Sequence, residues 1–149
     1  MRTGAGELLV LDASVAAKWI LPPGSEPFAE QALWLLRQYE TGELRFVVPD
    51  SFWAEIGNVL WKVVQQGRLP AANAYRAVAE LRNQKLPTVP ASLLLEEALA
   101  IAIAFRRSVD DSLYVALALQ SKAHLVTADE RLANALAARF PVKWLGSAW

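Results

Sequence analysis

Short apolar runs alternate with longer amphipathic segments along the whole chain. Runs bounded by polar or turn residues are typical of buried strands, and they predict strands at 8–11, 44–48, 124–127 and 142–145. The segment 85–89 is short and bounded by prolines, which predicts an edge strand. Parallel strands in the middle of a sheet have this continuous apolar character, because both of their faces are covered.

The segments between these runs have helical spacing or helix-end signals. Phe52, Ile56, Val59, Leu60 and Val63 follow a 3.6-residue period, for example. Helices are predicted at 12–21, from 25 or 26 to 42, at 52–66, 71–83 and 92–107, from 110 or 111 to 122, and at 129–139. The segment 92–107 is so rich in Ala, Leu and Ile that we expect it to be buried on most sides.

Alternation of strands and helices predicts an α/β fold. We expect a three-layer α/β/α sandwich with a mostly parallel sheet of about five strands. No internal repeat, linker or second domain is evident in the pattern, so residues 1–149 are predicted to form one domain with a core at about 8–145.

Composition narrows the chemistry that the chain can perform. Apolar residues make up 54% of the chain, which excludes a disordered or low-complexity protein. There is no cysteine and a single histidine, His124, so thiolate metal sites, Cys nucleophiles and paired imidazoles are excluded. His124 precedes a predicted strand and is interpreted as a structural or surface residue.

The chain shows no run long enough to span a membrane and no apolar leader at its start, and we expect a cytoplasmic protein. Its 15 basic and 15 acidic residues cancel. Four acids, proposed below as metal ligands, would leave 11 acidic residues against 15 basic ones, so a neutral total does not exclude binding to nucleic acid.

Acidic residues follow the predicted strands or begin the next helix. Asp12 follows the first strand, Asp129 comes two residues after the strand 124–127, and Asp110 and Asp111 begin a helix that leads into that strand. Glu55 is expected on the first turn of the helix after the second strand. In parallel α/β sheets, ligands bind beyond the carboxyl ends of the strands, so these carboxylates are predicted to converge.

A carboxylate cluster is tolerated when a hard cation neutralises it, and Mg²⁺ or Mn²⁺ prefers oxygen ligands. Such an ion can activate water for attack on a phosphodiester. Each acid alone has a plainer explanation: Asp12, Asp111 and Asp129 can each cap a helix, and Glu55 can be a solvated charge. The prediction therefore depends on their joint placement.

Four segments, in order and at these spacings, resemble the motifs of PIN domains of the VapC toxin type. They are DASVAAKW at 12–19, EIGNVL at 55–60, SVDDSLYVALA at 108–118 and LVTADERL at 125–132. The resemblance covers residues 8–145. It implies a metal-dependent endoribonuclease, the toxin of a type II toxin–antitoxin pair, with RNA as substrate, a cognate antitoxin as partner and a homodimeric assembly.

The same resemblance assigns roles to individual residues. Asp12, Glu55, Asp111 and Asp129 would form the acidic quartet, with Asp12 and Asp111 as the foremost Mg²⁺ or Mn²⁺ ligands. Supporting roles fall to Thr127, which would hydrogen-bond the cluster, to Asn58, one turn after Glu55, and to Ser14, which could equally cap a helix.

One position departs from the pattern. Asp110 stands where the family usually has an aromatic residue, so Asp110 is an alternative ligand to Asp111, although register with Tyr114 and Ala118 favours Asp111. This departure also motivates a rival hypothesis, a non-catalytic PIN-like scaffold that binds RNA or protein. A phospho-acceptor receiver domain is disfavoured, because Lys143 is poorly placed for one.

Two further groups of residues are candidates for contacts with partners. Basic side chains near the predicted site could bind phosphates, the plainer alternative being a solvated or helix-end charge: Lys18, Arg106, Arg107 and Arg131. Several of the six tryptophans fall on predicted helices. As a hypothesis, Trp34, Trp53 and Trp61 line a surface for the antitoxin, the alternative being a place in the core.

Overall fold

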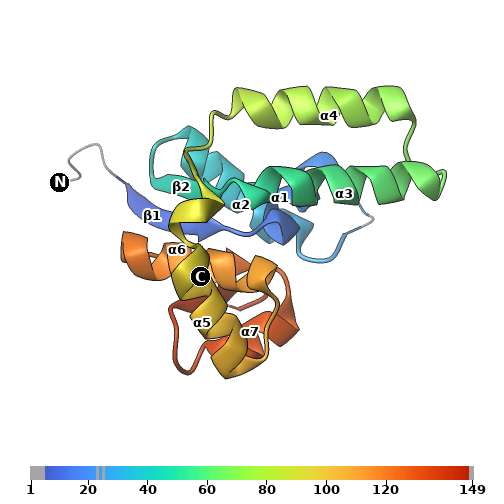
Figure 1. Ribbon diagram of the computed structural model, residues 1–149. Coiled ribbons are helices and arrows are strands. Elements are labelled where there is room, and N and C mark those ends of the chain that lie inside the picture. Colours follow the sequence, from blue (N-terminus) through green and yellow to red (C-terminus); the bar gives the residue numbers. More distant parts are fainter. Residues whose placement is uncertain (1–5, 23, 25, 148–149) are drawn as a thin grey trace.

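The computed structural model describes residues 6–22, 24 and 26–147 and has an α/β architecture (Figure 1). Within this part of the chain, five strands form one sheet in the order β3-β2-β1-β4-β5. The strands are β1 (Glu7–Leu11), β2 (Leu44–Pro49), β3 (Thr88–Val89), β4 (His124–Thr127) and β5 (Val142–Trp144). Every pairing between them is parallel, which confirms the predicted sheet.

The helices cover both faces of the sheet. They are α1 (Ala13–Ile20), α2 (Ala29–Glu40), α3 (Ser51–Gln65), α4 (Ala71–Asn83), α5 (Leu95–Phe105), α6 (Val109–Ser121) and α7 (Glu130–Leu136), with a 3₁₀ turn at Ala91–Leu93. Helices α1 to α4 lie on one side and α5 to α7 on the other, so the three-layer sandwich is confirmed (Figure 1). In the core, β1 is fully buried at Leu9, Val10 and Leu11, and α6 packs across β1, β2 and β4.

The order of the strands determines where a site can form. The chain leaves β1 toward β2 and β3, and it leaves β4 toward β5 on the opposite side. Neighbouring strands β1 and β4 therefore form the switch point of the sheet, where the connections diverge and leave a crevice at the carboxyl ends. Asp12 follows β1 directly and Thr127 ends β4, so both belong to this crevice.

The starts of α2 and α6 differ from the prediction. Helix α2 begins at Ala29, after Phe28 adopts a left-handed conformation (φ 60°), whereas the prediction placed its start at Ser25, which lies outside the described residues, or at Glu26. Helix α6 is capped by Ser108, whose Oγ accepts the backbone N–H of Asp111, and not by Asp110 or Asp111. Both aspartates are thereby left free of a capping role in the first turn of α6.

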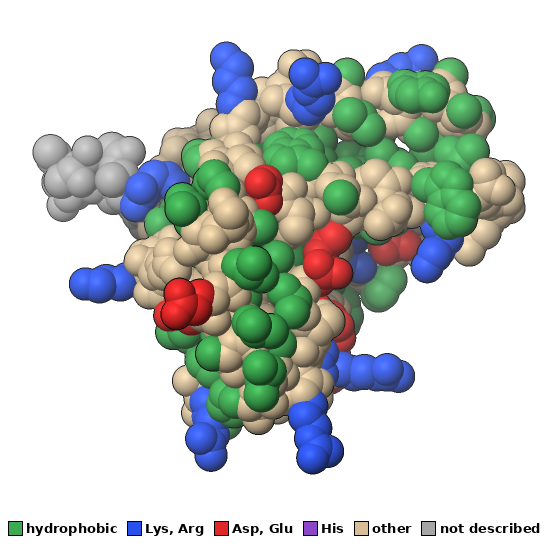
Figure 2. Space-filling view, viewed as in Figure 1, with side chains coloured by type: hydrophobic (Ala, Val, Ile, Leu, Met, Phe, Trp, Pro, Cys, Tyr) green, Lys and Arg blue, Asp and Glu red, His purple; other side chains and the backbone are tan. Residues whose placement is uncertain are grey.

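The expectation that the segment 92–107 is buried on most sides was wrong. In α5 only Ala98 and Ile101 are buried, whereas Leu95, Leu99 and Ile103 are exposed, Ile103 by 73%. Figure 2 shows the resulting green stripe along α5. The composition of a helix shows that it is apolar, but not whether the chain itself covers each of its faces. Glu55 also lies slightly later in its helix than expected, four residues after the first residue of α3.

Candidate active site

Asp12 is the most buried carboxylate at the switch point. Its backbone N–H donates to the carbonyl of Val126 (3.1 Å), which fixes the end of β1 against β4. Only 8% of Asp12 is exposed. Its Oδ2 accepts hydrogen bonds from the hydroxyl groups of Thr127 (2.6 Å) and Ser14 (2.9 Å). Asp12 is the N-cap residue of α1, and these two hydroxyl groups are the main partners of its carboxylate.

The two hydroxyl groups that hold Asp12 are themselves fixed by the backbone after β4. The N–H of Ala128 donates to Ser14 Oγ (3.0 Å), and the N–H of Asp129 donates to Thr127 Oγ1 (3.0 Å). Burial raises the pKa of Asp12, while hydrogen bonds from Thr127 and from the side chain and backbone of Ser14 oppose that rise. The predicted contacts of Thr127 and Ser14 with the acidic cluster are thus present.

Glu55 reaches the same crevice from α3. Its Oε2 accepts a hydrogen bond from the hydroxyl of Tyr114 on α6 (2.7 Å), and that hydroxyl accepts the backbone N–H of Ala13 (3.3 Å). Burial raises the pKa of Glu55 to about 7; the Tyr114 hydrogen bond opposes this rise, and the charges of Asp12, Asp110 and Asp111 add to it. Tyr114 is 1% exposed, and burial raises its pKa, so it stays a hydrogen-bond donor.

Asp111 and Asp110 differ in how they relate to the other acids. The charges of Asp110 and Asp111 both raise the pKa of Glu55, and that of Asp111 also raises the pKa of Asp12. Asp111 also forms an ion pair with Arg107, Nη2 to Oδ2 at 3.1 Å. That Asp111 and not Asp110 is the ligand stays a prediction.

Asp129 lies at the same edge of the sheet but is engaged differently. Its Oδ1 accepts the backbone N–H groups of Arg131 (3.0 Å) and Leu132 (3.3 Å), so it caps α7. Through its own N–H it is joined to Thr127 and so to Asp12. Asp129 thus caps a helix, as the alternative explanation predicted. The hydroxyl of Thr127 still links it to Asp12.

The donor set can be compared with what a cation needs. Within residues 6–22, 24 and 26–147, no three His, Cys, Asp or Glu side chains meet in a geometry that would hold a metal ion by themselves. Mg²⁺ is usually held by one or two carboxylates together with water and substrate phosphates. Asp12, with Oδ1 not used by either hydroxyl, and the partly exposed Asp111 fit such a hydrated hard cation. The positive charge of the cation would also relieve the repulsion between these acids.

The other candidates differ in their exposure and in their partners. Asn58 is exposed, and the hydrogen bond that Glu55 receives comes from Tyr114, so the supporting role of Asn58 stays a prediction. Lys18 is buried and pairs with Glu26 (3.5 Å). Arg131, like Arg106, is exposed, and His124 is an exposed residue of β4.

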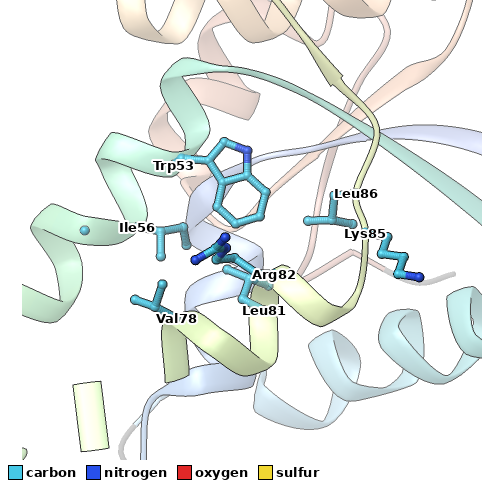
Figure 3. A pocket seen from close by; sticks show the side chains of 8 residues that line it. Trp53, Ile56, Val78, Leu81, Arg82, Lys85 and Leu86 are labelled. Carbon is cyan, nitrogen blue, oxygen red and sulfur yellow. The ribbon is translucent and has the colours of Figure 1, made fainter. Parts of the chain in front are cut away.

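A groove runs between α3 and α4. One part has a volume of about 560 Å³, and Figure 3 shows Trp53 and Ile56 of α3 facing Val78 and Leu81 of α4 across it. A second part of about 270 Å³ shares Gly57 and Val78 with the first and continues to Trp61 and Tyr75. The lining is mainly apolar; Arg82 and Lys85 are the cations of its first part.

Tyr114 and Arg107 are site residues whose roles the sequence did not reveal. Tyr114 entered the sequence argument only as a register marker, and its contact with Glu55 joins positions 59 residues apart. Arg107 was considered for phosphates or as a solvated or helix-end charge, although its spacing from Asp111 (i, i+4) is a known signal for an ion pair on or next to a helix.

Comparison with known proteins agrees with this fold. The profile of the family described as PIN domain matches residues 9–136. Ribonuclease VapC3 of Pyrobaculum aerophilum is 30% identical over 128 residues, covering 85% of this chain and 92% of that protein. Among solved structures, PAE2754 from Pyrobaculum aerophilum has a TM-score of 0.67 at 20% identity, covering 96% of this chain and 91% of that one. A toxin–antitoxin complex from Klebsiella pneumoniae has a TM-score of 0.61 at 14% identity, covering 94% and 99%.

Proposed function

The chain belongs to the PIN domain family, and from this premise we propose that it is a divalent-metal-dependent endoribonuclease, the toxin of a type II toxin–antitoxin pair. The observation that carries the proposal is the hydrogen-bonded acidic site at the switch point of the sheet, where Ser14 and Thr127 hold Asp12 and Tyr114 holds Glu55. A relative named as a ribonuclease supports RNA as the substrate. Because the proposed substrate is RNA, we also propose that the protein acts in the cytoplasm.

Asp12 and Asp111 would hold Mg²⁺ or Mn²⁺, with Glu55 and Asp129 completing the acidic quartet. When bound, such an ion makes a water molecule more acidic and offsets charge on the phosphoryl oxygens. Thr127 keeps Asp12 in place through its 2.6 Å hydrogen bond. Because Tyr114 occupies Oε2 of Glu55, Oε1 is the oxygen that would take a proton from the attacking water.

The test is cleavage of a panel of structured and single-stranded RNAs with Mg²⁺, with Mn²⁺ and with EDTA. We expect cleavage with either cation, none in EDTA, and none by Asp12→Ala. Circular dichroism would check that this variant still folds, and Glu80→Ala, which removes an exposed acid of α4, would serve as the matched control. Full cleavage in EDTA would refute the metal mechanism, whereas binding of RNA without any cleavage would favour the rival scaffold function.

An antitoxin is proposed as the protein partner. The toxin–antitoxin complex from Klebsiella pneumoniae shares the fold, and the groove between α3 and α4 offers this chain an apolar surface. Trp61 is 60% exposed, and Trp34 is 44% exposed. A large exposed aromatic side chain next to a groove is typical of a protein-binding surface. Trp53 lines the groove itself.

A homodimer is proposed as the assembly. Leu95, Leu99 and Ile103 recur every fourth residue on the exposed side of α5, so they form one apolar stripe. Sedimentation equilibrium should give twice the chain mass for the wild type and the single mass for Ile103→Glu. A monomeric wild type would refute the dimer while leaving the nuclease proposal intact.

A further inference from the structure

Arg107 lies in a rigid link between two helices at the rim of the site. Helix α5 ends at Arg106 in a left-handed conformation (φ 55°), and the backbone N–H of Arg107 still donates to the carbonyl of Ala102 (3.2 Å). Ser108 then caps α6, and its carbonyl accepts both the N–H (3.1 Å) and the hydroxyl (2.8 Å) of Ser112. The backbone on both sides of Arg107 is therefore fixed.

The side chain of Arg107 donates one hydrogen bond to Asp111. Nη2 donates to Asp111 Oδ2 at 3.1 Å, while the neighbouring Nε is buried and has no hydrogen-bond partner. Nε and Nη2 form the edge with which an arginine grips a carboxylate or a phosphate through two parallel hydrogen bonds. A buried donor without a partner disfavours the state in which it occurs. The ion pair with Asp111 therefore uses half of this edge and leaves the other half open.

The ion pair also bears directly on cation binding. Arg107 holds the carboxylate of Asp111, whose charge acts on both Asp12 and Glu55. The side chains of Arg107 and Asp111 are 23% and 32% exposed, so incoming solutes can reach the pair. A cation that takes the carboxylate of Asp111 must compete with the positive charge of Arg107 and would leave its guanidinium without a partner.

We propose that Arg107 is a positioning residue that holds Asp111 while no divalent ion is bound, is displaced when the ion takes that carboxylate, and then grips a phosphate group of the RNA. The inference rests on the proposed function. It gives one side chain two successive anionic partners, first the carboxylate of Asp111 and then a substrate phosphate. Binding of the ion thereby makes a phosphate-binding group available beside the acids.

Substitution can separate the charge of Arg107 from its forked shape. Arg107→Gln removes the charge but keeps a side-chain donor for Asp111, whereas Arg107→Lys keeps the charge and loses the fork. Arg106→Gln is the matched control, because Arg106 is the neighbouring residue, its side chain is exposed, and the substitution removes the same charge. Mn²⁺ affinity of the full chain would be measured by isothermal titration calorimetry without RNA, and kcat and KM for RNA separately.

Arg107→Gln should bind Mn²⁺ roughly tenfold more tightly, because a unit positive charge a few ångströms from a divalent ion contributes about that much at a solvated site. The KM for RNA should rise, with a smaller change in kcat. Arg107→Lys should restore the wild-type Mn²⁺ affinity but not the KM, and Arg106→Gln should leave the Mn²⁺ affinity within about twofold of the wild type.

Weaker or unchanged Mn²⁺ binding by a folded Arg107→Gln variant would overturn the inference, since a residue that merely supports Asp111 cannot oppose the cation. An unchanged KM in both Arg107 variants would overturn the phosphate step. If the wild type binds no Mn²⁺ at all, the proposed metal dependence itself fails, which is a different result from either of these.

Discussion

Glu55→Gln should stabilise the metal-free protein at alkaline pH. Burial raises the pKa of Glu55 from 4.5 to about 7, so the native state binds this proton more tightly than the unfolded state does. The free energy of unfolding of the wild type therefore falls as pH rises between these values. Gln has no charge to bury, and its carbonyl oxygen can still accept the hydrogen bond from Tyr114. The free energy of unfolding of the variant therefore does not fall in this way as pH rises.

The size of the effect follows from the same pKa difference. A pKa that moves from 4.5 to about 7 corresponds to ~3 kcal/mol. Glu55 is only half-buried, and solvent screening reduces this figure to ~1–2 kcal/mol. Above pH 8, where Glu55 is ionised in both states, the variant should be more stable by that amount, and the difference should vanish toward about pH 4.

Urea unfolding in EDTA at several pH values would measure this difference. Glu80→Gln is the control, because Glu80 is exposed on α4 and its substitution should change stability by less than ~0.5 kcal/mol at any pH. A Glu55→Gln variant that is no more stable than the wild type at pH 8 would refute the view that burial of this charge costs stability. Added Mn²⁺ should reverse the order of the two proteins, since the ion stabilises the wild type through its carboxylates.

Three further outcomes are expected. Tyr114→Phe removes the hydroxyl that donates to Glu55 and should lower the free energy of unfolding by ~1–3 kcal/mol in urea titrations; an unchanged midpoint would contradict the hydrogen bond. Asp111→Asn should weaken Mn²⁺ binding in calorimetry far more than Asp110→Asn, and the reverse order would make Asp110 the ligand. Trp61→Ala should leave stability within ~0.5 kcal/mol, because the side chain is 60% exposed, but should weaken antitoxin binding in surface plasmon resonance; unchanged affinity would remove it from the proposed surface.

Much of the fold could be predicted because buried parallel strands and their helices have local signatures. The apolar runs at 8–11 and 124–127 became the central pair β1 and β4, and their carboxyl ends place Asp12 and Thr127 together. The start of α2 could not be predicted, because Phe28 adopts a left-handed conformation for which glycine would be the usual signal.

The contacts within the site depend on tertiary packing and were predicted less completely. Their spacing along the chain predicted that Asp12, Glu55 and Asp111 share one crevice. It did not predict which neighbouring residue contacts each of them. Tyr114 reaches Glu55 only because α6 packs across β1 and β2, and no local pattern shows that. The exposed side of α5 was missed for a related reason: an apolar helix can be covered by its own chain or by another molecule.

The two hydroxyl groups beside Asp12 link its carboxylate to the backbone after β4. The N–H groups of Ala128 and Asp129 donate to the oxygens of Ser14 and Thr127, and these hydroxyl groups in turn donate to Asp12 Oδ2. The loop after β4 thus directs two hydrogen bonds to the carboxylate of Asp12, and these oppose the rise in its pKa that burial causes.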